Sequence, residues 1–322
     1  MNPVFAWFKR YLLQFVVLIA VIVSMYSLYP NFHVEASLER LIPLGVIAAG
    51  LAVTMIAGEF DLSIASMAAL AGALTVVFSG LGLIVAVVIA IIGCTLLGML
   101  QGWAIAKLGI NSLVFTVGTL ILIRGLTWLV CGGLAISVDD IFASDVFQVK
   151  FLFLSPLSAT ALVVLIGLGI FLARTRWGRE LYALGSSRHE AIAAGVNYKR
   201  GMIVAFGISA GCGAVGGSLT SALSGSAAPD ALESMLVTGL AAVLVGGISL
   251  SGGRGTMVNV FLGFAIIAVL ASGLAGMGSK AFVSQLFTGI FLLAIVLIDY
   301  GIKRISEQNK RGRQRKLAEV TA

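Results

Sequence analysis

The chain alternates long apolar segments with short polar ones. Each apolar run is about 20 residues long and continuous, which is the length of helix that crosses the hydrocarbon core of a bilayer. Strands of a membrane barrel would be roughly 10 residues long and alternate in polarity. The pattern therefore predicts an all-α, polytopic membrane protein of about ten transmembrane helices. The predicted spans are residues 11–29, 40–58, 62–79, 81–106, 112–131, 151–173, 201–223, 235–250, 255–275 and 281–300.

The composition favours a membrane protein over a soluble one. Of the 322 residues, 59% are hydrophobic and 11% are charged, whereas soluble domains carry about 25% charged residues. A soluble enzyme and a disordered chain are excluded on this ground. Three cysteines spread over apolar runs and two histidines predict neither a disulfide framework nor a metal site. The sequence also shows no cluster suited to nucleophilic catalysis, so no enzyme is predicted.

The net charge of +7 predicts orientation rather than nucleic-acid binding. With ten spans and a cytoplasmic N-terminus, nearly all lysines and arginines fall in cytoplasmic loops, and only Arg40, Lys150 and Lys280 fall outside. Both termini are therefore expected in the cytoplasm. The short basic tail, residues 303–322, is expected to lie beside anionic lipid. No nucleic-acid partner is predicted, because the basic residues lie between apolar runs.

The basic loop 174–200 contains signals of a short capped helix. Ser187 and Glu190 have the spacing of a capping box, and Gly195 follows at the position beyond a helix C-terminus. These signals predict a cytoplasmic helix over 188–194, with small apolar residues on one face. A connection between two spans needs no capped helix, so this one is interpreted as a docking element for another protein. The alternative is a helix that lies at the lipid headgroups.

A polar turn, Gly58-Glu59-Phe60-Asp61-Leu62-Ser63, separates the second and third predicted spans. Carboxylates at membrane depth are costly and are usually functional. Glu59 and Asp61 are therefore candidates for a polar part of a translocation pathway that hydrogen-bonds a hydroxylated solute. The alternative is a cytoplasmic turn with both carboxylates in water, and the sequence leaves the depth of the turn open.

A second polar stretch opens the fifth predicted span. Asn111 followed by Ser112 predicts the start of a helix. Thr116 and Thr119 are three residues apart and share one face of that helix. They point either at a pore or at a neighbouring helix, and hydrogen bonds between helices are the commoner use of threonine in membranes.

Glycine patterns carry two further interpretations. Gly50-Leu51-Ala52 is followed by Gly58, and Gly239-Leu240-Ala241 is followed by Gly247 at the same spacing. This likeness indicates a weak internal repeat, and chance matching is the alternative. An even number of spans between the copies would make them parallel. The stretch 211–216 matches a dinucleotide fingerprint, but no strand precedes it, so its glycines are assigned to helix packing. The chain is therefore expected to have no nucleotide site of its own.

Four stretches together resemble the permease subunits of bacterial ABC importers for monosaccharides, the ribose-type family. The resemblance covers roughly residues 40–300. The matching residues are Gly58, Asp61, Leu62, Ser63 and Ser66; Asn111, Thr116, Gly118, Thr119, Arg124 and Gly125; the glycine, small polar pair and alanines of 185–195; and Gly246, Gly247, Leu250, Ser251, Gly252, Gly253, Gly255 and Thr256. Glu59 and Ala65 stand where the family usually has glycine, so the local turn and the preferred solute are expected to differ.

The resemblance implies a division of labour among subunits. Residues 1–322 would form a single transmembrane permease domain in the inner (plasma) membrane, paired with a second permease chain that is identical or homologous. A periplasmic solute-binding protein would deliver a monosaccharide or related small polyhydroxylated solute. A cytoplasmic ABC ATPase would dock on the loop 174–200 and drive alternating access, so that this chain binds no cofactor and ATP is used by its partner.

Two groups of residues are expected to carry this function. The substrate pathway is expected to include Glu59, Asp61, Ser63, Asn111, Thr116 and Thr119. Coupling to the ATPase is expected to involve Gly185, Ser187, Glu190, Ala191, Ile192 and Gly195. The alternative function is an ion-coupled secondary transporter that uses Glu59 or Asp61, although such a protein would be expected to show more carboxylates within its spans.

Overall fold

The computed structural model describes residues 3–29, 32–34, 42–138 and 155–278, together with short stretches between 280 and 297. A further short apolar helix covers Gln285–Ala294. The other described elements are α1 (Pro3–Leu28), α3 (Ile42–Ile56), α4 (Ile64–Val77), the 3-10 turn η1 (Ser79–Leu81), α5 (Leu83–Leu108), α6 (Ser112–Val130), β1 (Ile136–Ser137), α8 (Pro156–Arg174), α9 (Arg176–Ser186), α10 (Arg188–Ala193), α11 (Tyr198–Ser224), β2 (Ser226–Ala227), α12 (Glu233–Val245) and α13 (Met257–Gly276).

The helices match the predicted apolar segments, but they differ in length. Five of the described helices are long and apolar enough to cross a membrane, and α8 with α9 forms a further pair bent by 76°. Helices α3, α4 and α12 have 15, 14 and 13 residues, fewer than the about 20 that a full span needs. An all-α membrane protein is confirmed, whereas ten spans and cytoplasmic termini stay predictions.

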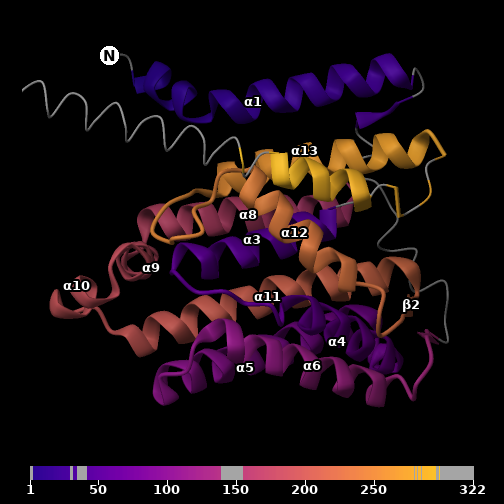
Figure 1. Ribbon diagram of the computed structural model, residues 1–322. Coiled ribbons are helices and arrows are strands. Elements are labelled where there is room, and N and C mark those ends of the chain that lie inside the picture. Colours follow the sequence, from indigo (N-terminus) through magenta and orange to yellow (C-terminus); the bar gives the residue numbers. More distant parts are fainter. Residues whose placement is uncertain are drawn as a thin grey trace, which may run out of the picture.

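Figure 1 shows the helices side by side in one bundle, with α1 along α13 at one side and α4, α5 and α6 at the other. Helix α11 runs through the middle and contacts α3, α4 and α5. Helices α9 and α10 lie at one end of the bundle, here named the α10 end. At the opposite end, here named the strand end, β1 pairs antiparallel with β2, with Ile136 opposite Ala227. The sequence patterns did not predict this short ladder.

Close backbone contacts explain the central position of α11. Gly213 and Gly217 lie against the backbone of α4, and Gly98 and Gly102 of α5 lie against the backbone of α11. A Cβ atom at any of the four positions would crowd main-chain atoms of the neighbouring helix. Gly213 belongs to the stretch 211–216, so its assignment to helix packing is confirmed.

Helices α3 and α12, which carry the two copies of the predicted internal repeat, end with the same backbone conformation. Each helix is followed by a glycine with positive φ, Gly58 at +81° and Gly247 at +91°. In both, the glycine N–H donates to the carbonyl three residues earlier, and the next N–H donates to the carbonyl five residues earlier. Both connections then meet at Gly185, at the α10 end. The two stretches that the predicted repeat aligns therefore end their helices in the same way, and the repeat itself and the orientation of its copies stay predictions.

Candidate functional site

The connection between α3 and α4, residues 57–63, runs from the α10 end into the interior of the bundle. Ile64, the first residue of α4, lies against Gly213, roughly 20 Å along α11 from its start at Tyr198. The side chains on this connection are shielded, with exposed fractions of 6% for Glu59 and 1% for Asp61. The alternative of a turn with both carboxylates in water is therefore wrong.

Asp61 holds the start of α4 through a buried hydrogen-bond network. Its Oδ1 atom accepts from the backbone N–H of Ser63 at 3.0 Å, from the hydroxyl of Ser63 at 2.6 Å and from Nε2 of Gln101 at 3.3 Å. Gln101 lies on α5, and Ser209 of α11 is fully buried beside the same carboxylate. Among the described residues, Asp61 has no ion pair, so hydrogen bonds alone offset the cost of burying it.

Gln101 was missed by the sequence analysis, although a signal for it exists. It is a polar side chain inside a long apolar run, and it is 5% exposed. A buried polar side chain in a membrane helix normally has a specific partner. Here the partners are Asp61 and Ser63, which joins α5 to the α3–α4 connection.

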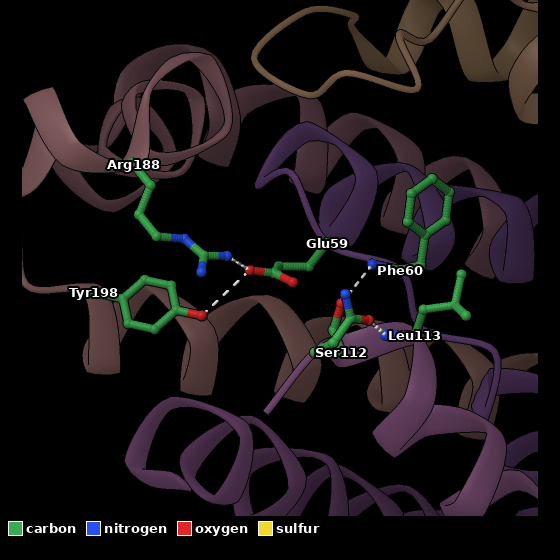
Figure 2. A network of polar contacts seen from close by, with 7 residues as sticks. Glu59, Phe60, Ser112, Leu113, Arg188 and Tyr198 are labelled. Carbon is green, nitrogen blue, oxygen red and sulfur yellow. Dashed lines mark hydrogen bonds and ion pairs between the residues drawn. The ribbon is translucent and has the colours of Figure 1, made fainter. Parts of the chain in front are cut away.

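Glu59 belongs to a different network from Asp61. Its carboxylate forms an ion pair with Arg188, and its Oε1 atom accepts a hydrogen bond from the hydroxyl of Tyr198 at 3.2 Å (Figure 2). The guanidinium of Arg188 also lies over the ring of Tyr198, 4.5 Å from its centroid. The two carboxylates that the sequence suggested as one polar element therefore diverge, Asp61 toward α5 and Glu59 toward α10 and α11.

The polar residues of α6 have separate positions. The hydroxyl of Thr116 donates to the carbonyl of Phe60 at 3.3 Å. The N–H of Phe60 donates to the hydroxyl of Ser112 at 3.3 Å (Figure 2). Asn111 caps α6 by accepting from two N–H groups of its first turn, as the sequence predicted. Thr119 donates to the carbonyl of Thr116 within the helix. Of Asn111, Thr116 and Thr119, which were predicted for the pathway, only Thr116 has a hydrogen bond to the described α3–α4 connection, and Ser112 has one as well.

Helix α10 forms where the sequence predicts it, but without the capping box. Ser187 is the N-cap residue, yet its side chain makes no capping hydrogen bond. The first turn closes through the backbone instead, because the carbonyl of Ser187 accepts from the N–H of Ala191 at 2.9 Å. Gly195 follows the helix with a φ of +88°, as predicted.

Helix α10 exposes fewer of the residues expected on its docking face than the sequence suggested. Ala191, expected on the docking face, is 5% exposed and packs inward. Ile192 is 47% exposed, and Glu190 and Gly195 are also exposed. The outward face of α10 therefore contains one large apolar side chain beside a carboxylate, because the helical repeat turns Ala191 toward the bundle.

Four glycines bring three backbone segments together at the α10 end. They are here named the glycine junction and consist of Gly58, Gly185, Gly252 and Gly253. A Cβ atom at Gly185 would overlap the carbonyl oxygen of Ile56. The N–H of Gly253 donates to this same oxygen at 2.9 Å. The end of α9 is therefore in direct contact with the connections that follow both α3 and α12.

Comparison with known proteins gives one family and several relatives. A family described as "Branched-chain amino acid transport system / permease component" matches residues 34–296. The chain is 30% identical to the L-arabinose transport system permease protein AraH of Escherichia coli over 226 residues, 69% of each chain. It is 29% identical to the ribose import permease protein RbsC of Bacillus subtilis over 257 residues, 79% of this chain and 80% of that protein.

A third relative extends the pattern. The D-allose transport system permease protein AlsC of Escherichia coli is 29% identical over 272 residues, 78% of this chain and 79% of that protein. No solved structure gives a significant match to the chain. The three relatives share the role of a transport permease but are named for three different sugars.

Proposed function

This chain belongs to the family of transport-system permease components, and on that premise we propose that it forms the transmembrane pathway of an ATP-binding-cassette importer for a monosaccharide or related small polyhydroxylated solute. It is a multi-pass protein of the inner membrane. The relatives named for arabinose, ribose and allose support a sugar as the solute. Because those sugars differ, the class of solute is proposed and not its identity.

The observation that carries the proposal is the position of α10. This short helix lies at one end of the bundle with Ile192 and Glu190 exposed, while Ala191 and Gly185 face the chain itself. A separate ATPase that docks on the exposed face would act on the glycine junction directly behind it. The junction in turn contacts the connections after α3 and α12, so one docking event would reach both connections.

The interior end of the α3–α4 connection is the proposed polar part of the pathway. Asp61, Ser63 and Thr116 are buried at the start of α4 and of α6. Alternating access requires helices to separate, and separation here would expose hydrogen-bonding groups suited to hydroxyls of a solute. Glu59, Asn111 and Thr119 stay predictions for the pathway, and the contacts of Glu59 favour the different role argued below.

The proposed assembly has four kinds of partner. A cytoplasmic ABC ATPase would supply the motion, a periplasmic solute-binding protein would deliver the solute, and a second permease chain would complete the pathway. Membrane lipid would cover the outer apolar surface, where large side chains are exposed on α1, α5, α6 and α8. In this assembly residues 1–322 act as one permease domain, with the α10 end and the tail in the cytoplasm.

Transport driven by an ion gradient is less well supported. The Oδ1 atom of Asp61 accepts hydrogen bonds from Ser63 and Gln101, and the carboxylate of Glu59 is paired with Arg188. The relatives are named as permease proteins, and the family is described as the permease component of a transport system, which supports a chain that works with separate subunits.

Uptake into proteoliposomes tests the proposed function. Vesicles that contain the chain, its cognate ATPase and its solute-binding protein are expected to accumulate a labelled monosaccharide only when ATP is present on the ATPase side. Ionophores that dissipate proton and sodium gradients are expected to leave the rate unchanged. Accumulation driven by an ion gradient in vesicles without the ATPase would show that the chain is a secondary transporter instead.

A further inference from the structure

We propose that Glu59, Arg188 and Tyr198 form a clamp through which a displacement of α10 pulls on the α3–α4 connection. This inference rests on the proposed function, because it concerns how motion from a docked ATPase reaches the pathway. The three side chains come from three separate elements: the connection after α3, the first residue of α10 and the first residue of α11. Figure 2 shows the side chains of Arg188 and Tyr198 both pointing at the carboxylate of Glu59.

The clamp differs from a surface ion pair because one partner is shielded. The side chain of Glu59 is 7% exposed, whereas that of Arg188 is 49% exposed. Separating the pair would leave a carboxylate inside the protein without its counter-ion, which is far more costly than separating two exposed charges. The stacking of Arg188 on the ring of Tyr198 further restricts the guanidinium. The pair therefore resists separation when α10 moves.

Where α9 meets Gly58 of the α3–α4 connection, the glycine junction offers close main-chain contacts and no hydrogen bond among the described residues, so it transmits such a pull only weakly. Its contacts are mainly close approaches between main-chain atoms of Gly58, Gly185 and Gly252. Contacts of this kind resist compression strongly but offer little resistance when the surfaces move apart. The junction thus transmits a push from α9 and α10 to the α3–α4 connection, and the clamp transmits a pull. Together they would make the connection follow α10 in both halves of a transport cycle.

The connection relays the motion inward over a few residues. Phe60, next to Glu59, is hydrogen-bonded through its backbone to Ser112 and Thr116 at the start of α6. Asp61, two residues from Glu59, holds the N-terminus of α4 through the N–H of Ser63. A pull on Glu59 therefore moves the starts of both α4 and α6. Glu59 and Arg188 are positioning residues in this proposal and do not contact the solute.

Measurement of solute transported per ATP hydrolysed tests the clamp. The complete complex in proteoliposomes is used, with Glu59→Gln and, separately, Arg188→Glu. Both variants are expected to lower the ratio about tenfold, since the ion pair is lost. ATPase binding is measured in parallel, so that the ratio is compared only among assembled complexes. The charge-swapped double variant Glu59→Arg with Arg188→Glu is expected to recover the ratio to within about threefold of the wild type, because opposite charges again face each other.

A matched control uses an ion pair whose two residues lie in the same helix. Arg176 and Glu180 are paired at 2.8 Å within α9, and Glu180 is also shielded, with 12% of its side chain exposed. Glu180→Gln is expected to leave the transport ratio unchanged. A ratio that falls equally in this control would show that any lost ion pair in the segment has the same effect, which would overturn the clamp.

Further results would overturn the proposal without touching the proposed function. One is a wild-type ratio in Glu59→Gln, and another is a charge-swapped variant that folds but recovers nothing. If the charge-altering variants fail to fold, Arg188→Lys tests the clamp in their place, because it keeps the cation but loses the planar stacking. A ratio lowered about threefold in Arg188→Lys supports the clamp, and a wild-type ratio overturns it. Failure of the proposed function would appear differently, as a wild-type complex without ATP-dependent uptake.

Discussion

Replacing Gly185 by alanine is expected to destabilise the chain by about 3 kcal/mol and to abolish ATP-driven transport. The added Cβ atom would overlap the carbonyl oxygen of Ile56 and crowd the N–H of Gly253. Both neighbours are main-chain atoms and cannot move aside as a flexible side chain can. The α9–α10 segment would be pushed off the connections after α3 and α12. Thermal unfolding in detergent and uptake in proteoliposomes measure the two effects.

Gly167→Ala is the matched control for this prediction. Gly167 lies in the neighbouring helix α8, and a Cβ atom there meets nothing within 4 Å. The substitution is expected to leave uptake unchanged and to raise helix propensity slightly. If Gly185→Ala behaves like Gly167→Ala, the glycine junction carries no coupling and the role proposed for it is wrong.

Replacing Asp61 by alanine is expected to cost about 3 kcal/mol of stability and most of the expressed protein. The N–H of Ser63 would lose its buried acceptor, and an unsatisfied buried donor costs about 1–3 kcal/mol. Nε2 of Gln101 would keep only its bond to the hydroxyl of Ser63. Asp61→Asn keeps an acceptor oxygen in the same place, so it is expected to express near the wild-type level. Its uptake rate is nevertheless expected to fall about tenfold, because the charge at the start of α4 is lost.

Expression and uptake of the two Asp61 variants separate structure from transport. Membrane yield and unfolding temperature report on the network, and uptake per milligram of inserted protein reports on the pathway. Equal losses of yield and uptake in Asp61→Asn would indicate a purely structural turn. The residue would then be removed from the proposed pathway, while Thr116 and Ser63 would need to be tested in the same way.

Local patterns in the sequence were sufficient for features that depend on neighbouring residues. Continuous apolar runs predicted the positions of the helices, Asn111 predicted the start of α6, and Gly195 predicted the turn after α10. These features depend on backbone hydrogen bonds over a few residues, which residue type controls directly. The capping box at Ser187 is the exception, because the first turn of α10 closes without the hydroxyl.

Features that depend on tertiary contacts could not be predicted in this way. Glu59 and Arg188 are 129 residues apart in the chain, so no local period links them. The depth of Asp61 depends on where α4 meets α11, which is decided by close packing at Gly213 and Gly217. The inward position of Ala191 likewise depends on how α10 lies against the bundle. Gln101 is the one missed residue for which the sequence itself carries a signal.

The central claim is that a separate ATPase engages the exposed face of α10. Cross-linking tests it most directly, with a single cysteine in place of Ile192 and the three buried native cysteines replaced by alanine. Leu134→Cys serves as the control, because this residue is 75% exposed and lies beside β1 at the strand end. The proposal predicts a cross-link between position 192 and the ATPase subunit, and none from position 134. An intact, transporting complex in which position 192 does not cross-link would contradict the proposal.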